Sequence, residues 1–145
     1  MRDVTTRPEP PVFPDWEALR RLALEAQGRA YAPYSRFHVG AAALVDDGRL
    51  ISGCNIENAS YGLTLCAECT LIGELVNGGG GRLVAVVTVG NGAPAMPCGR
   101  CRQLLWEHGG PDCLIDGTGT PMPMAEVLPN AFDQRDLDEG VTPAS

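Results

Sequence analysis

The chain contains no lysine. All 11 of its basic residues are arginine, and against 18 acidic residues they leave a formal net charge of −7. The arginines are scattered along the chain and form no basic cluster. Because binding to a phosphate backbone depends on grouped positive charge, this composition argues against DNA or RNA as a partner. A small neutral substrate fits the chain better.

Long apolar runs are also missing. No segment approaches the roughly 20 apolar residues that cross a bilayer, and residues 1–7 lack the apolar stretch of a signal peptide. We therefore expect a cytoplasmic protein without membrane contact. The 145 residues leave room for one domain. We expect it at 15–135, after a flexible lead at 1–14 and before a flexible acidic tail at 136–145.

Cysteine is present six times, and four of these residues form two CxxC pairs, at 66–69 and 98–101. Without an export signal, paired cysteines indicate metal binding in a reducing compartment rather than disulfides. The other two, Cys54 and Cys113, lie in strand-like runs. We interpret both as buried small hydrophobic residues.

The two pairs also supply the groups of a catalytic zinc site. Three protein ligands leave a fourth position for water, and zinc lowers the pKa of that water toward neutrality. In zinc deaminases the first ligand is followed two residues later by a glutamate that is not a ligand, with Pro-Cys-x-x-Cys downstream. This pattern predicts Glu68 as the proton carrier. The predicted ligands are Cys66, Cys98 and Cys101.

Cys69 leaves a second interpretation open. Four thiolates from two CxxC pairs can also form a closed structural zinc site, in which Glu68 has no role. Zinc ribbons usually present such pairs on tight turns, whereas here each pair leads into a helix-like segment, at 70–76 and at 102–107. Two helix N-termini directed at the metal would stabilise thiolates, which favours the catalytic site.

Strand-like and helix-like segments alternate along the chain. Asp15 precedes the first periodic segment and is predicted to be its N-cap. Hydrophobic periodicity and turn residues predict the elements that follow. The predicted elements are a helix from 16 to near 31, a strand hairpin at 38–45 and 50–54, a helix at 65–76, a strand at 83–89, a helix from 98 to near 108, a strand at 113–116 and a short helix at 125–128. This alternation predicts an α/β fold.

Five blocks of sequence resemble the small homotetrameric cytidine deaminases. They lie at residues 32–37, 39–42, 53–62, 66–68 and 97–103, and the resemblance extends over about residues 15–135. It implies a three-layer α/β/α sandwich with a central mixed sheet of about five strands, and one zinc ion per subunit. The implied reaction is hydrolytic deamination of cytidine and 2′-deoxycytidine to uridine and 2′-deoxyuridine, with release of ammonia, in pyrimidine salvage.

The resemblance also implies substrate contacts. Asn55 and Glu57 would hold the ribose 3′-hydroxyl, since an amide beside a carboxylate suits a group that both donates and accepts. Phe37 would pack against the pyrimidine. The backbone N–H of Ala67 would bind the pyrimidine carbonyl oxygen.

Three further aromatic residues are implied at boundaries between subunits, because the family shares its pockets between neighbouring chains. Tyr61 and Phe132 would contact substrate there, and Phe132 matches an aromatic residue that closes a pocket. Tyr34 would lie near the same boundary. We therefore expect a homotetramer whose pockets contain residues from more than one chain.

The sequence departs from the family pattern at Cys69, where an arginine usually hydrogen-bonds the ligand sulfurs. Arg100 lies between two ligands instead. We predict that its side chain reaches the thiolate of Cys66 or Cys98, while Cys69 fills the vacated space as a neutral thiol. Blasticidin S deaminases also lack that arginine and contain Pro-Cys-Gly-Arg-Cys, and they remain an alternative. The ribose-binding block at 55–58 favours a nucleoside.

Overall fold

The computed structural model describes residues 12–140, and its first helix is α1 (Trp16–Gln27). The Asp15 carboxylate accepts a hydrogen bond from the N–H of Ala18 at 3.1 Å, which confirms the predicted N-cap. The helix ends earlier than predicted. After Gln27 the chain tightens into a turn, in which the N–H of Arg29 bonds the carbonyl of Ala26 at 2.9 Å.

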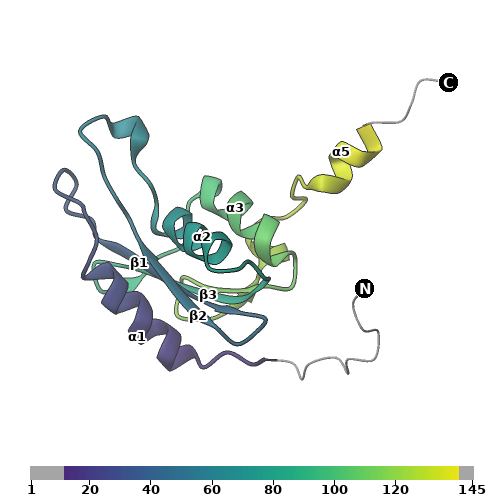
Figure 1. The fold of residues 1–145 in the computed structure, drawn as a ribbon, viewed down its shortest axis with the longest axis horizontal. Coiled ribbons are helices and arrows are strands. Elements are labelled where there is room, and N and C mark those ends of the chain that lie inside the picture. The colour runs from purple at the N-terminus through teal and green to yellow at the C-terminus, as the bar shows by residue number, and fades with distance from the viewer. Residues whose placement is uncertain (1–11, 141–145) are drawn as a thin grey trace.

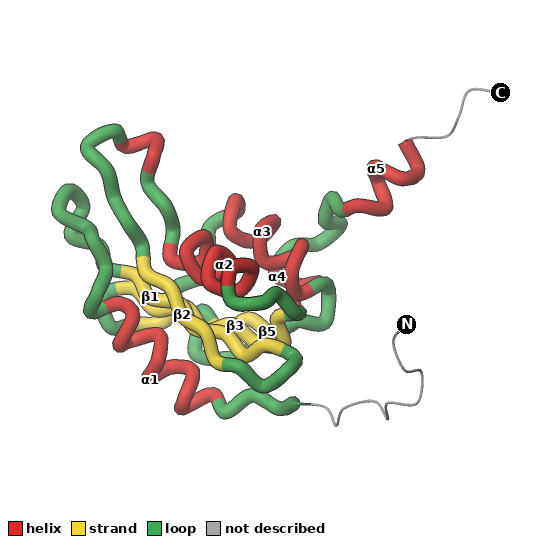
Figure 2. The backbone as a smooth tube through the Cα atoms, in the orientation of Figure 1, coloured by secondary structure: helices red, strands yellow, loops and turns green. Residues whose placement is uncertain are grey.

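A mixed sheet forms the middle layer of the molecule (Figures 1 and 2). Its strands are β1 (Val39–Val45), β2 (Leu50–Cys54), β3 (Leu83–Gly90), β4 (Ala93–Pro94), β5 (Leu114–Asp116) and β6 (Met122–Pro123). They lie in the order β2-β1-β3-β5-β6, and β4 pairs with β3. Among these strands β3 and β5 pair in parallel, and the other pairs are antiparallel. The two-residue strand β4 was not predicted.

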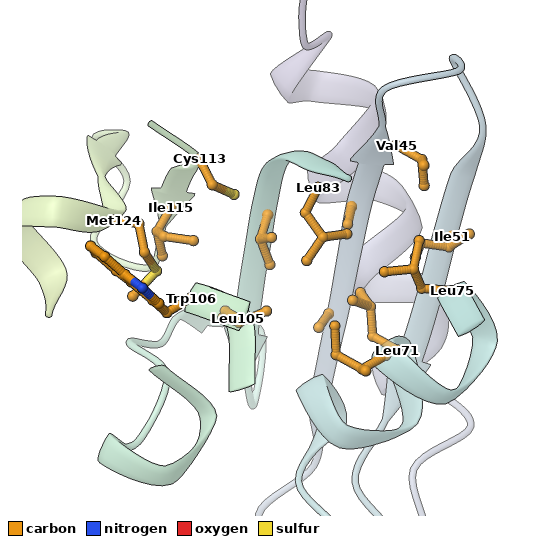
Figure 3. Packing of buried hydrophobic residues seen from close by; sticks show 14 of the residues in the cluster. Val45, Ile51, Leu71, Leu75, Leu83, Leu105, Trp106, Cys113, Ile115 and Met124 are labelled. Carbon is orange, nitrogen blue, oxygen red and sulfur yellow. The ribbon is translucent and has the colours of Figure 1, made fainter. Parts of the chain in front are cut away.

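Helices cover both faces of the sheet. α1 lies on one face, and α2 (Ala67–Asn77) and α3 (Gly99–Gly109) lie on the other (Figures 1 and 2). The side chains of β3 serve both layers: Val87 packs in the cluster with α1, and Val86 packs in the cluster with α2 and α3. Figure 3 shows Leu71, Leu75 and Leu105 in this second cluster. The predicted three-layer α/β/α sandwich is confirmed.

Helix α2 is fixed tightly against β2. A Cβ atom on Gly53 would lie 2.4 Å from the backbone nitrogen of Leu71 and 2.5 Å from the carbonyl oxygen of Ala67, so only glycine permits this approach. Beside it, the hydroxyl of Thr70 accepts a hydrogen bond from the N–H of Cys54 at 3.0 Å and lies 2.8 Å from the Cys54 carbonyl oxygen. The start of α2 is therefore held in a fixed place.

The C-terminal part contains α4 (Met124–Val127) and α5 (Gln134–Gly140), and α5 projects from the body of the molecule (Figure 1). Residues 136–140 are thus helical where a flexible tail was expected. The reason is a reciprocal cap: Asp133 accepts from the N–H of Arg135, and Asp136 accepts from the N–H of Asp133, both at 2.9 Å. Residues 1–11 and 141–145 lie outside the described part.

Within residues 12–140, none of the helices combines the length and the apolar content that crossing a bilayer would require.

Candidate active site

Three cysteine sulfurs meet where α2 and α3 begin. Cys66 is the N-cap of α2, Cys98 is the N-cap of α3, and Cys101 lies in the first turn of α3. Their Sγ atoms all lie within 4.8 Å of one another. Zn–S bonds of about 2.3 Å at tetrahedral angles place sulfurs roughly 3.8 Å apart, so the cluster fits a zinc ion held by three thiolates.

The environment of the sulfurs favours a bound cation. Burial raises the pKa of Cys101 and of Cys66, and the negative charge of Glu68 raises both further. At Cys98 the backbone N–H of Cys101, helped by that of Arg100, lowers the pKa of the thiol. Three adjacent thiolates repel one another, and a divalent cation offsets this repulsion.

Within residues 12–140, these three cysteines are the only group of three or more cysteine, histidine or acidic side chains arranged to hold a metal ion. Cys69 lies outside the cluster and lines a separate surface pocket with Arg100 and Leu104. The alternative of a closed four-thiolate site is therefore wrong. Cys113 is buried, and burial raises its pKa to about 12, as expected of a small core residue. Cys54 is half-buried.

Arg100 does not make the side-chain contact predicted for it. Its side chain is exposed, and within residues 12–140 its guanidinium forms no hydrogen bond to a ligand sulfur. The Arg100 side chain lines the surface pocket that contains Cys69. The backbone of Arg100 has a smaller effect, since its N–H at the start of α3 adds to that of Cys101 in lowering the pKa of the Cys98 thiol.

Glu68 lies in the first turn of α2 and is 3% exposed. It lines a cavity of about 200 Å³ together with Cys66 and Cys98. The hydroxyl of Thr88, on β3, donates a hydrogen bond to Glu68 Oε1 at 3.2 Å. A carboxylate beside the three sulfurs can accept a proton from a water molecule bound there and pass it to a neighbouring substrate atom.

The same cavity contains the groups expected to contact the pyrimidine. Ala67 begins α2, so its N–H has no carbonyl partner within the helix. Phe37 lines the cavity and is half-exposed, and it packs so closely against Gly90 that a Cβ atom on Gly90 would lie 2.6 Å from the ring. The buried amide of Asn55 donates to the Phe37 carbonyl at 2.8 Å and accepts from the N–H of Val39 at 2.9 Å. Asn55 thus fixes the backbone around Phe37.

A second pocket, of about 270 Å³, adjoins the cavity at Thr64 and contains Glu57. The Glu57 carboxylate accepts hydrogen bonds from the N–H groups of Tyr34 and Ser35 at 2.9 and 3.1 Å and from the Ser35 hydroxyl at 2.5 Å. The Ser35 hydroxyl is the main cause of a pKa lowered below the ordinary 4.5. Ligand sites usually measure roughly 300–1,000 Å³, so a nucleoside would need both hollows.

The predicted aromatic residues lie in different places. Tyr61 lines the pocket of Glu57, and its ring meets that of Tyr34 edge-on at a centroid distance of 5.8 Å. Phe132 is not brought to this site within one chain. It lies beside α3, where the Gln103 side chain donates to its carbonyl at 2.7 Å, and it is 57% exposed.

Two hydroxyl residues at the site were missed by sequence reasoning. Ser35 belongs to the block at 32–37, but nothing in that block indicated that its side chain meets Glu57. The role of Thr88 could have been suspected from the sequence, because it is the only polar residue in the apolar strand 83–89. A buried hydroxyl in a central strand needs a partner, and that partner is Glu68.

Comparison with known proteins gives one consistent result. The model of the protein family described as the cytidine and deoxycytidylate deaminase zinc-binding region matches residues 15–115 of this chain. The cytidine deaminase of Mycobacterium tuberculosis is 58% identical over 124 residues, covering 85% of this chain and 93% of that protein. The cytidine deaminase of Halalkalibacterium halodurans is 41% identical over 131 residues, covering 86% of this chain and 99% of that protein.

Solved structures agree with the sequence matches. The crystal structure of cytidine deaminase from M. tuberculosis aligns with a TM-score of 0.81 and 56% identity, covering 83% of this chain and 99% of the other. The chain therefore belongs to the cytidine deaminase family.

Proposed function

We propose that this protein is a zinc-dependent enzyme that hydrolyses cytidine and 2′-deoxycytidine to uridine and 2′-deoxyuridine, with release of ammonia. The observation that carries the proposal is the place of Glu68, a buried carboxylate beside a three-sulfur metal cluster in a cavity that opens toward Glu57. The close relatives named as cytidine deaminases support the same reaction.

The catalytic work is divided between the metal ligands and Glu68. Cys66, Cys98 and Cys101 would hold the zinc ion, which would supply a Lewis acid that makes water easier to deprotonate. Glu68 would accept a proton from the attacking water and give it to N3 of the pyrimidine, which makes C4 electrophilic, while the water oxygen bonds to C4. Glu68 would then take the proton of the new C4 hydroxyl and deliver it to the amine, so that the C4 carbonyl forms, the C–N bond breaks and ammonia leaves.

The remaining residues orient the nucleoside. The N–H of Ala67 would hold the pyrimidine carbonyl oxygen, and the ring of Phe37 would pack against the base. Glu57 would accept from the ribose 3′-hydroxyl. Asn55 can assist, because its two backbone bonds use one of its two N–H groups and one oxygen lone pair, leaving one of each for a hydroxyl.

We propose further that the enzyme works as a homotetramer in the cytoplasm. The loop with the short helix η1 (Tyr61–Leu63) stands away from the body of the molecule (Figures 1 and 2), and Tyr61 is 73% exposed there. A contact with a neighbouring subunit would cover this loop and bring aromatic residues of one chain toward the pocket of another. A reducing cytoplasm suits three free thiolate ligands.

A substrate panel tests the function. Purified protein with zinc is incubated with cytidine, 2′-deoxycytidine, cytosine and blasticidin S, and loss of the amino group is followed by ultraviolet absorbance. We expect turnover of the two nucleosides. Turnover of blasticidin S alone would identify the alternative deaminase.

The variant Glu68→Gln tests the proton carrier. Glutamine keeps the shape of the side chain but cannot carry the proton, so we expect kcat to fall about 10²–10⁴-fold. Zinc content, measured by mass spectrometry of the metal, should stay at one ion per chain. Glu25→Gln on the exposed side of α1 is the matched control and should keep full activity. Near-normal turnover by Glu68→Gln would contradict the assignment.

A further inference from the structure

Thr88 is a polar residue in an otherwise apolar strand. The sequence of β3 is Leu-Val-Ala-Val-Val-Thr-Val-Gly, and the side chain of Thr88 lies on the face that carries α2 and α3, two residues after Val86. Thr88 is only 1% exposed. Valine has nearly the same shape as threonine and lacks the hydroxyl that must be satisfied when buried. Packing of the strand therefore does not account for the hydroxyl at this position.

The partner of that hydroxyl is the Glu68 carboxylate. Thr88 Oγ1 donates to Glu68 Oε1 at 3.2 Å. Within residues 12–140, no other side chain donates a hydrogen bond to this carboxylate, and no fully buried side-chain oxygen lacks a partner. Glu68 Oε2 therefore borders open space, and the open space that Glu68 lines is the cavity beside the cysteine cluster.

The two oxygens of Glu68 thus have different surroundings. The terminal torsion of a glutamate side chain has a broad, nearly two-fold preference, so packing alone defines it poorly. Threonine is stiff at χ1 because it is branched at Cβ, and here it sits on a central strand between two neighbours. A donor this rigid can hold one carboxylate oxygen in place and leave the other to react.

We propose that Thr88 is a positioning residue that anchors Glu68 Oε1, so that Glu68 Oε2 is the oxygen that moves the proton. This inference rests on the proposed function, because it concerns the orientation of its proton carrier. Without the hydroxyl, the carboxylate rotates among several orientations and only some of them face the cavity. The loss then falls on the chemical step rather than on substrate binding.

Two variants of Thr88 isolate the hydroxyl. Thr88→Val removes it and keeps the shape, and Thr88→Ser keeps it in a smaller side chain. We expect kcat for cytidine to fall about 10- to 100-fold in Thr88→Val, with KM near that of the unmodified enzyme. Thr88→Ser should regain most of kcat. Thr120→Val is the control and should behave like the unmodified enzyme, because within residues 12–140 the exposed Thr120 is bonded through its backbone N–H and carbonyl, both to the Thr118 hydroxyl, and not through its own hydroxyl.

Crystal structures with zinc provide a measurement that does not depend on the substrate. In Thr88→Val the carboxylate of Glu68 should be rotated or present in several orientations, while the cysteine cluster and the bound zinc are unchanged. A single unmoved carboxylate would overturn the positioning role whatever the enzyme acts on. Unchanged kcat in Thr88→Val, or equal losses in Thr88→Val and Thr88→Ser, would overturn it as well.

The two proposals fail in different ways. If the unmodified protein turns over none of the nucleosides, the proposed function is wrong, and the orientation of Glu68 is still decided by the crystal structures. If the unmodified protein is active and Thr88→Val matches it in kcat, the function stands and the role of Thr88 is wrong.

Discussion

At the scale of single residues, we expect the Ser35–Glu57 contact to set the pH range over which Glu57 can bind the substrate. The Ser35 hydroxyl and two backbone N–H groups stabilise the Glu57 anion and hold its pKa below 4.5. A lowered pKa means that Glu57 stays ionised until the pH falls well into the acid range. We therefore expect the KM for cytidine to stay flat from neutral pH down to about 4.5.

The variant Ser35→Ala removes the main cause of this shift. The pKa of Glu57 should rise, and the KM for cytidine should begin to increase at a higher pH than in the unmodified enzyme, with kcat little changed. The measurement is KM as a function of pH. Ser60→Ala, on the exposed loop that leads into η1, is the control, because within residues 12–140 Ser60 is hydrogen-bonded through its backbone N–H and carbonyl and not through its hydroxyl. If KM rises at the same acid pH in Ser35→Ala and in the unmodified enzyme, Glu57 does not contact the sugar.

Residue patterns predicted the chemistry of the site better than its supporting contacts. Short motifs indicated the three ligands and Glu68, because ligand type and spacing limit what such a cluster can bind. They could not indicate which hydroxyl meets which carboxylate. Thr88 and Glu68 are 20 residues apart and Ser35 and Glu57 are 22 apart, so each contact exists only once the sheet has formed. Arg100 shows the reverse error, since a contact of its side chain with a ligand sulfur was predicted and the side chain is exposed.

At the scale of elements, the sequence predicted the middle of each helix and strand well and the ends less well. Periodicity shows which face is buried, but an end depends on local hydrogen bonds. The tightened turn after Gln27 ended α1 early, and the cap formed by Asp133 and Asp136 made α5 helical in an acidic segment. Arg135 beside Asp133 lowers the pKa of that carboxyl to about 2, so the cap persists over a wide pH range.

Two glycines test how α2 is held in place. Gly73 is exposed on α2, and a Cβ atom there would meet nothing within 4 Å, so Gly73→Ala should raise the free energy of unfolding by roughly 0.5–1 kcal/mol. Gly53→Ala should lower it by about 1–3 kcal/mol, because its Cβ would press on the backbone of α2. It should also reduce activity by shifting Cys66 and Glu68.

The measurement for this pair is denaturant unfolding at one protein concentration, together with kcat for cytidine. Both variants add one methyl group, so a difference in their unfolding free energies reflects the contact of residue 53 with α2 and not the size of the side chain. Equal stabilities would mean that α2 does not depend on the close approach at Gly53.

At the scale of the whole molecule, we expect the exposed apolar side chains of one chain to mark where neighbouring subunits would bind. Tyr61 and Leu63 are 73% and 64% exposed on a loop that projects beside the pocket of Glu57. Phe132 is also exposed and lies away from the cavity of its own chain. Grouped apolar side chains of this kind are typical of protein–protein contacts. One chain therefore holds the chemical groups, and assembly would complete the walls around the substrate.

The assembly can be measured directly. Four chains of 15.3 kDa give a mass of about 61 kDa, which we expect from size-exclusion chromatography with light scattering. Leu63→Arg places a charge on the projecting loop, where burial against a partner would be costly, and should yield smaller species with reduced activity. Leu24→Arg, on the exposed side of α1 across the sheet from α2, should remain tetrameric and active. A fully active monomer of the unmodified chain would show that each pocket is complete within one chain.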